Sequence, residues 1–383
     1  MRASLLPHIA LLSIILITYT SITILFPVIP LYASFLGASK SEVGLIVGIF
    51  SYVAALLLIP FGALSDRFSR PAILMLGIAL LSSAYLLYLA IASTRDLFVV
   101  RIVHGAVIAL LLPTITALII DLSPHERRGA YVGVMSMAMQ VGFVFGPLIG
   151  GILLSVYGYH GTFIACAMLA IVCVAPCGIL VMRRNFVSKM SAYSPEESSF
   201  WNRKVLAALL IPALATLTSG TIVFSVPLFV KEMGMGSVEA GVAISSMYVT
   251  SAAMRIPAGV LSDIKGRVKV ILAGIFIEGV ATTMYYLTSD WVGVLLVSAT
   301  VGIGMGMVMP ASIAMLGDFL PHERRGMGMG MMSASMQLGI ALGASTMGVV
   351  AEYLGFRLMY VICGTVQLVL ASAVALAFFL LRS

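Results

Sequence analysis

Residues 121–142 read DLSPHERRGAYVGVMSMAMQVG, and residues 318–339 read DFLPHERRGMGMGMMSASMQLG. The two stretches share the hexapeptide PHERRG and lie 197 residues apart. The same offset aligns IPFGALSDRFSR at 59–70 with IPAGVLSDIKGR at 256–267, without a gap. A constant offset over several blocks predicts that the chain is built from two copies of one structural unit.

The chain of 383 residues is 61% hydrophobic and only 10% charged. Soluble domains have about 45–50% apolar and about 25% charged residues, so this composition excludes a soluble globular enzyme and predicts a polytopic membrane protein. The net charge of +7 is spread over short clusters between apolar runs, which argues against a nucleic-acid partner. The four cysteines lie inside apolar segments, and we expect neither disulfides nor a metal site.

Twelve apolar segments are long enough to cross a bilayer, where only helices satisfy their own backbone groups. The first is too long for the apolar core of a signal peptide and corresponds to the seventh in the repeat, so we expect it to be retained. The twelve segments cover residues 7–34, 41–63, 71–93, 97–120, 128–156, 161–183, 204–230, 238–261, 268–288, 291–317, 327–352 and 357–381.

Lysine and arginine are distributed unevenly among the breaks between these segments. Of the 22, 16 lie at the two termini or in the breaks on the same side, and four lie in the other breaks. The positive-inside rule therefore predicts cytoplasmic termini. Six spans per copy make the repeats parallel, as in the two halves of a rocking transporter. We expect an all-α membrane protein with twelve transmembrane helices in two six-helix bundles, residues 1–183 and 204–383, related by a pseudo-two-fold axis along the membrane normal and joined by a cytoplasmic linker at 184–203.

The loops after the second and eighth spans resemble a signature of the major facilitator superfamily, G-x-L-x-D-R-x-G-R. Residues 62–70 read GALSDRFSR, with Ser69 where glycine is usual, and residues 259–267 read GVLSDIKGR, with Ile264 where arginine is usual. The glycine of this loop is expected to let helices approach closely. The resemblance implies a cytoplasmic latch of the outward-facing state, although the basic residues alone could instead serve only to set the topology. Its expected members are Gly62, Asp66, Arg67, Arg70, Asp121, Gly259, Asp263 and Arg267.

The fifth span carries a glycine pattern similar to that of the superfamily's drug–proton antiporters. The pattern consists of Gly133, Gly142, Gly146, Pro147, Gly150 and Gly151. Gly142, Gly146 and Gly150 should lie on one helix face and allow close backbone contact, and Pro147 should bend the helix. The second copy has Ala344 and Met347 at two of these positions, so only the first half is specialised. A general packing face is the alternative interpretation.

Four ionisable residues inside spans are candidates for proton coupling: Arg101, His104, Arg255 and Glu278. Arg101 and His104 resemble the start of an antiporter pattern in span 4, although Arg101 could also snorkel to the interface and His104 could simply pack. Charged groups at bilayer depth normally have partners, so we expect an ion pair between Arg255 and Glu278, either structural or protonatable. Span 1 lacks the carboxylate of many drug antiporters.

The spans expected to surround a central cavity offer apolar, aromatic and methionine side chains. The candidates are Tyr19, Thr23, Phe26, Tyr32, Thr218, Phe224, Met305 and Met309. Such a lining suits a lipophilic or neutral compound. No phosphate-binding loop for ATP occurs.

We therefore predict a secondary transporter of the plasma membrane and not an enzyme. It would be monomeric and would export small lipophilic compounds in exchange for protons by alternating access, with no cofactor besides the proton. Its partners would be its substrate and the lipid bilayer. Two alternatives stay open: a sugar or metabolite carrier on the same fold, and a non-transporting membrane receptor or lipid scramblase.

Overall fold

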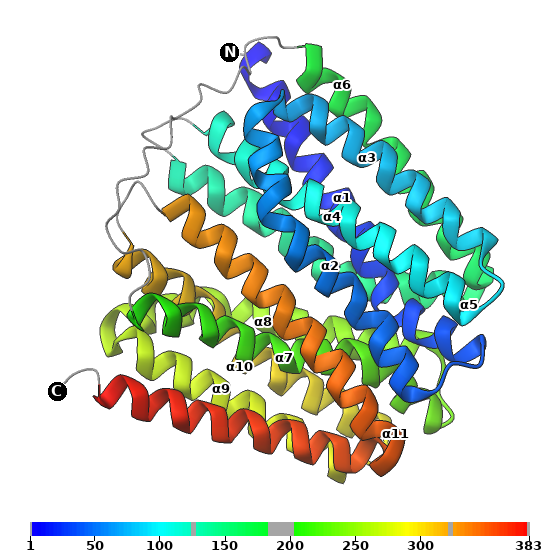
Figure 1. Cartoon of the computed structure of the whole chain (residues 1–383), viewed down its shortest axis with the longest axis vertical. Coiled ribbons are helices and arrows are strands. Elements are labelled where there is room, and N and C mark those ends of the chain that lie inside the picture. The colour runs from blue at the N-terminus through cyan, green and yellow to red at the C-terminus, as the bar shows by residue number, and fades with distance from the viewer. Residues whose placement is uncertain (1, 124–127, 183–202, 321–324, 381–383) are drawn as a thin grey trace.

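A computed structural model describes residues 2–123, 128–182, 203–320 and 325–380, and these residues form helices joined by short turns (Figure 1). Most of the predicted linker and of both PHERRG hexapeptides lies outside them. The helices are α1 (Arg2–Phe35), α2 (Lys40–Arg67), α3 (Arg70–Leu87), α4 (Thr94–Leu122), α5 (Arg128–Val172), α6 (Val174–Met182), α7 (Arg203–Glu232), α8 (Ser237–Lys265), α9 (Arg267–Met284), α10 (Trp291–Phe319) and α11 (Arg325–Leu380), with 3₁₀ turns η1 (Tyr88–Ala90) and η3 (Tyr285–Leu287).

The predicted spans fall on these helices wherever the structure describes them. The predicted spans 128–156 and 161–183 fall on α5 and α6, and the last two fall on α11; the chain changes direction between the two spans of each pair, at Gly158 and Gly355, with φ of 67° and 76°. Nine helical stretches of the described residues are long and apolar enough to cross a membrane. The protein is therefore a multi-pass, all-α membrane protein, and the number of twelve crossings stays a prediction.

The internal repeat extends to backbone details. The turns η1 and η3 lie at equivalent positions, and so do the positive-φ residues Gly37 and Gly234. Ser93 and Asp290, again 197 residues apart, cap α4 and α10 by accepting a hydrogen bond from the amide three residues on. One position differs: Gly266 has φ of 94°, whereas Ser69 has φ of −62° because a side chain disfavours the left-handed region.

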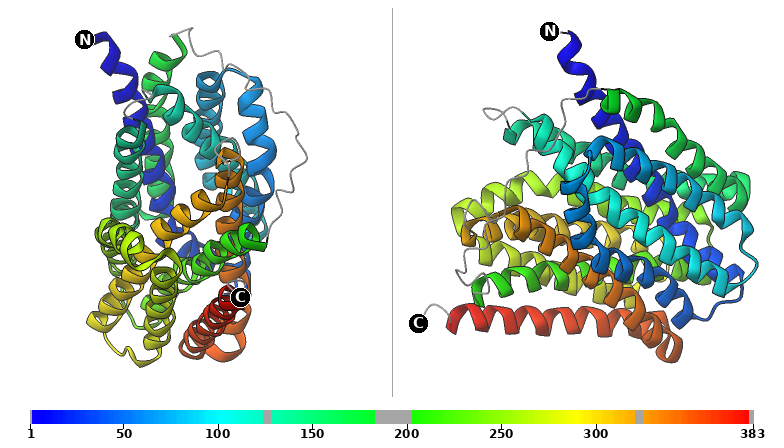
Figure 2. Two further views of the ribbon diagram at one scale, coloured as in Figure 1. Left: turned by 90° about the vertical axis from the view of Figure 1, so that its left-hand side faces the viewer. Right: turned by 45° about the horizontal axis from the view of Figure 1, so that its top comes forward.

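The helices form two groups that meet at one end of the molecule. In Figure 1, α1–α6 and α7–α11 converge at the lower right and diverge from there, with the N-terminus at the top and the C-terminus at the left, and Figure 2 shows the two groups from further sides. The main contacts between the groups are α2 with α11 and α5 with α8. We call the end with the chain termini the termini side and the opposite end the far side.

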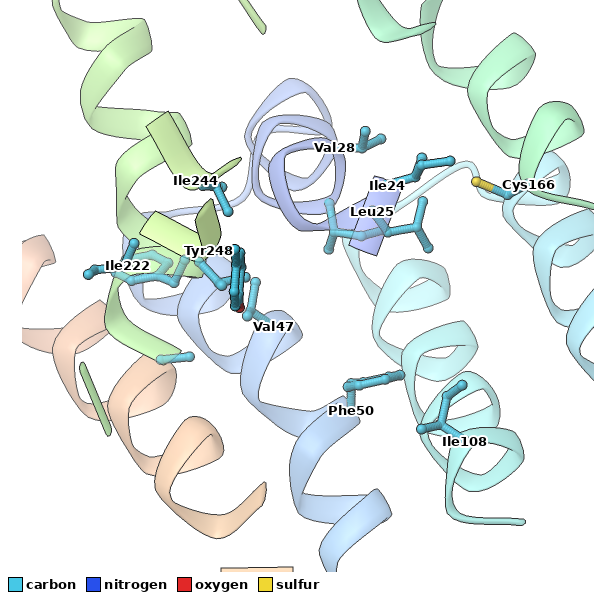
Figure 3. Close-up of a cluster of buried hydrophobic side chains, with 14 of the residues drawn as sticks. Ile24, Leu25, Val28, Val47, Phe50, Ile108, Cys166, Ile222, Ile244 and Tyr248 are labelled. Atoms are coloured by element: carbon cyan, nitrogen blue, oxygen red, sulfur yellow. The ribbon is translucent and has the colours of Figure 1, made fainter. Parts of the chain in front are cut away.

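The buried apolar core follows the same division. One cluster joins α1–α6 to the far-side parts of α7–α11; Figure 3 draws part of it, with Leu25, Val47 and Tyr248. A second cluster belongs only to the second group and includes Val205, Ile271 and Met315, towards the termini side. The two groups thus share a core only at the far side.

The glycine pattern of the fifth span packs α5 against α1, as expected. A Cβ atom on Gly142 would lie 2.8 Å from Cβ of Tyr19, one on Gly146 would lie 2.9 Å from the carbonyl oxygen of Thr20, and one on Gly150 would lie 2.9 Å from the carbonyl carbon of Ile24. Contacts this short leave no room for a side chain. Gly133, by contrast, has nothing within 4 Å of such an atom.

Gly146→Val should therefore force α1 and α5 apart, whereas the matched change Gly133→Val should be tolerated sterically. We expect Gly146→Val to lower the melting temperature in detergent and to abolish transport in reconstituted liposomes. Overpacking of a tight contact typically costs about 1–3 kcal/mol. A Gly146→Val protein as stable and active as Gly133→Val would show that the pattern is incidental to packing.

Candidate functional site

The two helix pairs that join the groups cross in the same way at equivalent residues. A Cβ atom on Gly44 of α2 would lie 2.8 Å from Cα of Gly348 in α11, and one on Gly241 of α8 would lie 3.3 Å from Cα of Gly151 in α5. The carbonyl oxygens of Ala344 and Pro147 contact the same two positions. The offset of 197 relates Gly44 to Gly241, Gly151 to Gly348, and Pro147 to Ala344. The glycine pattern of α5 therefore has two faces, one packed on α1 and one on α8 of the other group.

Polar contacts between the groups, among the described residues, all lie towards the far side. Lys40 at the start of α2 forms an ion pair of 2.7 Å with Glu232 at the end of α7, and its ammonium lies 4.3 Å from the ring centroid of Phe356. Lys231 donates a hydrogen bond to Ser34. A small cavity of about 230 Å³ lies among these residues. Further contacts are Ser41 with Glu352, Tyr52 with Ser345, Leu148 with Ser245, and Ser237 with Gly151.

On the termini side, the predicted latch residues form two equivalent clusters, each within one group. Arg70 donates to Asp66 at 2.7 Å and to both carboxylate oxygens of Asp121 at 2.6 Å. Arg267 likewise pairs with Asp263 and, at 3.4 Å, with Asp318. Arg70 therefore bridges the carboxylates of Asp66 and Asp121. Arg67 is exposed at the end of α2.

The two latch glycines do not mark close helix contacts in this conformation, contrary to expectation. The nearest atom to a Cβ on Gly62 would be 3.7 Å away, on Pro113, which is an ordinary van der Waals distance. Gly259 has nothing within 4 Å. Both glycines lie where the two groups have diverged, so the structure leaves them room.

Four aromatic rings meet where the groups join. Phe143 of α5 lies 5.6 Å from Tyr19 and 6.2 Å from Phe26 of α1, and 5.0 Å from Tyr248 of α8, measured between ring centroids. Phe26 also lies 6.2 Å from Tyr248. Tyr19 and Phe26 were expected at a cavity. Phe143 and Tyr248 were missed, although Phe143 directly follows Gly142 and Tyr248 lies two turns from Gly241 on the same helix face.

Most of the other cavity candidates are packed inside a single group. Thr23 donates to the carbonyl oxygen of Gly142, and Thr218 donates to Gln367. Tyr32 packs against Tyr159 and Phe163. Together with Phe224 and Met309, these side chains are at most 4% exposed, so they do not line an open space in this conformation. Met305 remains partly exposed, beside Ser219.

Arg101 does not snorkel to the interface but is buried between α4 and α2. Its guanidinium donates to the carbonyl oxygens of Ile46 and Val47 and lies 4.2 Å from the ring centroid of Phe50. His104 is 1% exposed and is hydrogen-bonded through Nδ1 to the hydroxyl of Tyr88. Both coupling candidates of span 4 are thus tied into the packing of the first group, and Nε2 of His104 has no partner.

The predicted ion pair between Arg255 and Glu278 is absent. Glu278 accepts a hydrogen bond of 2.9 Å from Gln367 instead, and Nε of Arg255 is buried without a hydrogen-bond partner. Helix α10 lies between the two, because Gly302 and Gly306 pack on α8 while Gly304 packs on α9 against Glu278. Sequence spacing gave both residues a similar depth but could not show that a third helix separates them.

Comparison with known proteins identifies relatives along the whole chain. The family model described as Major Facilitator Superfamily matches residues 11–247 and again 208–383. An uncharacterized MFS-type transporter of Methanocaldococcus jannaschii is 28% identical over 351 residues, 90% of each chain. The staphylopine export protein of Staphylococcus aureus is 23% identical over 379 residues, 95% of this chain and 94% of that one.

Two further matches bear on function and fold. The quinolone resistance protein NorA of Staphylococcus aureus is 30% identical over 143 residues, 37% of each chain. The crystal structure of a bacterial homolog of the human lysosomal transporter Spinster, in an inward-facing and unoccupied conformation, covers 97% of this chain and 96% of its own, with a TM-score of 0.80 at 18% identity. That similarity establishes the fold alone.

Charge reversal at the far-side ion pair should open the contact between the groups. We expect Lys40→Glu, which places two carboxylates together, to increase labelling of a Val43→Cys reporter by a membrane-impermeant maleimide, and Lys40→Glu/Glu232→Lys to restore protection. Val43 is 0% exposed and the four native cysteines are buried, so background labelling is low. Arg95→Glu, at an exposed residue near the same end, is the control. Equal labelling in all variants would show that the pair does not hold the groups together.

Asp66→Asn tests the latch cluster. Because Asp66 is exposed, losing its ion pair should change stability by only about 0–1 kcal/mol, so expression should be normal. We expect the transport rate of Asp66→Asn in liposomes to fall by more than this small loss of stability can explain. Asp66→Glu, which keeps the negative charge, should retain transport. Undiminished turnover of Asp66→Asn would remove the latch hypothesis.

Proposed function

Because the chain belongs to the Major Facilitator Superfamily, it is a membrane transporter of small molecules and not an enzyme, and we propose that it exports lipophilic compounds in exchange for protons. The proposal places the termini side in the cytoplasm of a plasma-membrane protein, as the distribution of basic residues indicates. The conformation joined at the far side is then open to the cytoplasm. Residues 1–183 and 204–383 would rock as two bundles about the crossings of α2 with α11 and of α5 with α8.

The proposal rests on one observation: the glycine pattern of α5 packs on helices of both groups. Gly142, Gly146 and Gly150 fix α5 on α1 within the first group, while Pro147 and Gly151 face Gly241 of α8 in the second. A sequence pattern that resembles drug–proton antiporters therefore lies at the contact between the two moving parts. The name of one relative, the staphylopine export protein, agrees with export, and the name of another, a quinolone resistance protein, agrees with a drug-like compound.

The aromatic rings beside this crossing suit a lipophilic substrate. Phe143 and Tyr248 come from different groups, and with Tyr19 and Phe26 they form an aromatic cluster in which Tyr248 is buried and the other three rings are partly exposed. Aromatic faces bind flat apolar compounds by stacking, at about 0.5–1.5 kcal/mol per pair beyond area burial. A ligand held between rings of both groups would respond directly to their relative movement.

One observation favours a second candidate, the export of a metabolite with an anionic group. Arg255 shares the face of α8 that carries Gly241, Ser245 and Tyr248, and it forms no ion pair with any described residue. An unneutralised guanidinium between the groups would attract a carboxylate.

A single assay separates these functions. Purified protein is reconstituted in liposomes with an imposed proton gradient and a pH-sensitive dye, and a panel of lipophilic cations, neutral drugs, organic anions and sugars is added. We expect compound-dependent proton movement for lipophilic members, reduced in Tyr248→Leu and unchanged in the control Phe276→Leu, whose side chain is 60% exposed on α9. Empty liposomes and a protonophore define the background.

Other outcomes have definite meanings. A response confined to anions and lost in Arg255→Gln would favour the metabolite exporter. Saturable counterflow of a labelled compound without proton movement would indicate a uniporter. No exchange with any compound, together with lipid scrambling in the same liposomes, would contradict export.

A further inference from the structure

Glu278 lies in the middle of α9 and is 0% exposed. Its Oε2 accepts a hydrogen bond of 2.9 Å from Nε2 of Gln367, and its Oε1 is buried without any hydrogen-bond partner. A buried carboxylate with one neutral donor and no cation is strongly disfavoured, whereas the neutral acid is tolerated. Glu278 is therefore held as the protonated acid in this conformation.

A chain of hydrogen-bond donors leads from α7 to this carboxyl group. The hydroxyl of Thr218 donates to Oε1 of Gln367 at 2.6 Å, and the amide of Gln367 donates in turn to Glu278. Thr218 and Gln367 are 0% and 2% exposed. Because both donors point towards Glu278, this chain of hydrogen bonds stabilises the carboxylate form of Glu278. Breaking the chain of hydrogen bonds favours the protonated form. Helix α7 also packs against α1 of the first group, so Thr218 lies on a helix that contacts both groups.

No basic side chain faces Glu278 from the helices packed around it, as far as these are described. From α10 the neighbour is the backbone of Gly304, and α11 adds the thiol of Cys363, which contacts Thr221 of α7. Arg255 of α8 is separated by α10. Charged residues of the surrounding helices lie near helix ends or at the turn in α11: Arg267 and Lys269 on α9, Lys231 and Glu232 on α7, Asp318 on α10, and Glu352 and Arg357 on α11.

The internal repeat provides a comparison within the same chain. At the positions 197 residues earlier, Leu81 stands for Glu278, Val107 for Gly304 and Ala170 for Gln367. All three are buried in the first group. The same packing site is thus built there from apolar residues alone, so neither the acid nor its amide partner is required by the fold. Glycine at 304 lets α10 approach α9 closely, because a Cβ there would lie 2.5 Å from the carbonyl oxygen of Gly274 and 2.7 Å from Cγ of Glu278.

We propose that Glu278 is the site that binds the coupling proton, a role that rests on the proposed exchange of compound for protons. On release, the O–H bond of the carboxyl breaks, the electron pair stays on Glu278, and the proton passes to water on the side to which the pathway is open. The carboxylate left behind is stabilised by Gln367 and Thr218. Coupling to the conformation requires that α7, as it moves against α1, also shifts relative to α9 and α11 within its own bundle, because that shift would move Thr218 away from Gln367.

The first experiment tests the bound proton without any substrate. Infrared spectra of the purified full-length protein at neutral pH should contain the carbonyl stretch of a buried protonated carboxylic acid, absent in Glu278→Gln. The band should persist in Thr365→Val, a control change of an exposed α11 residue whose hydroxyl bonds only to its own helix. In Gln367→Ala the band should remain to higher pH than in wild type. A wild-type spectrum without the Glu278 band overturns the proposal.

The second experiment tests coupling, with ethidium as the probe in proteoliposomes. Glu278→Gln should keep ethidium counterflow in the absence of a gradient but lose proton-driven accumulation. The double variant Glu278→Leu/Gln367→Ala, which places the first repeat's residues at these two positions and keeps Gly304, should behave in the same way and remain folded. Proton-driven accumulation in Glu278→Gln equal to wild type would place the proton elsewhere. A wild-type protein that shows the Glu278 band but moves no protons with any compound of the panel would instead overturn the antiport itself.

Discussion

Close approach of helices at glycine residues is the constraint on which the structure depends. Helices in lipid gain little from burying apolar surface against one another, so small residues that let backbones meet determine which helices pair. Here the two crossings between the groups, α2 with α11 and α5 with α8, rest on Gly44 with Gly348 and on Gly241 with Gly151. The far-side ion pair, the shared apolar core and the aromatic rings all lie next to these crossings. Divergence on the termini side leaves each arginine cluster within its own group.

The two halves share a frame but divide the polar residues unequally. The first half buries Arg101 and His104 against α2 and Tyr88, and the second half has Ser298 in place of Arg101, bonded to Tyr285. The second half buries Glu278 and Gln367 where the first is apolar. A residue that is replaced at the equivalent position of the other half is not required by the shared fold. The buried polar residues of each half are replaced in this way, so we assign them to functions of that half alone.

Much of the fold follows from the sequence because the signals were repeated. The constant offset predicted equivalent helices, and it holds for η1 and η3 and for the direction changes at Gly158 and Gly355. The sequence signature named the members of the first arginine cluster, Asp66, Arg70 and Asp121, but it did not name Asp318 of the second. Ser69 stands where the loop signature has glycine, and it is also the position where the backbone of the first copy differs from that of the second, at Gly266.

The candidate site was less predictable, because spacing along a helix gives depth but not the direction in which a side chain points. Thr23 and Thr218 have cavity-like chemistry, yet both face neighbouring helices of their own group. Arg255 and Glu278 have similar depth but lie on opposite sides of α10. Phe143 and Tyr248 were overlooked because aromatic residues are common in every span, and only the crossing of α5 with α8 brings them together.

The ion pair between Lys40 and Glu232 has a consequence for energetics. Its side chains are 32% and 51% exposed, and pairs of this kind contribute only about 0.2–1 kcal/mol. The ion pair therefore adds an energy comparable to thermal energy to the helix packing that closes the far side. Because both partners are partly exposed, separating them does not leave an unpaired charge buried in lipid. Dissolved salt weakens such an attraction. In the proposed alternating-access cycle, the balance between the two open forms should consequently vary with the ionic strength of the medium on that face, so saline and dilute surroundings would favour different resting states of the same molecule.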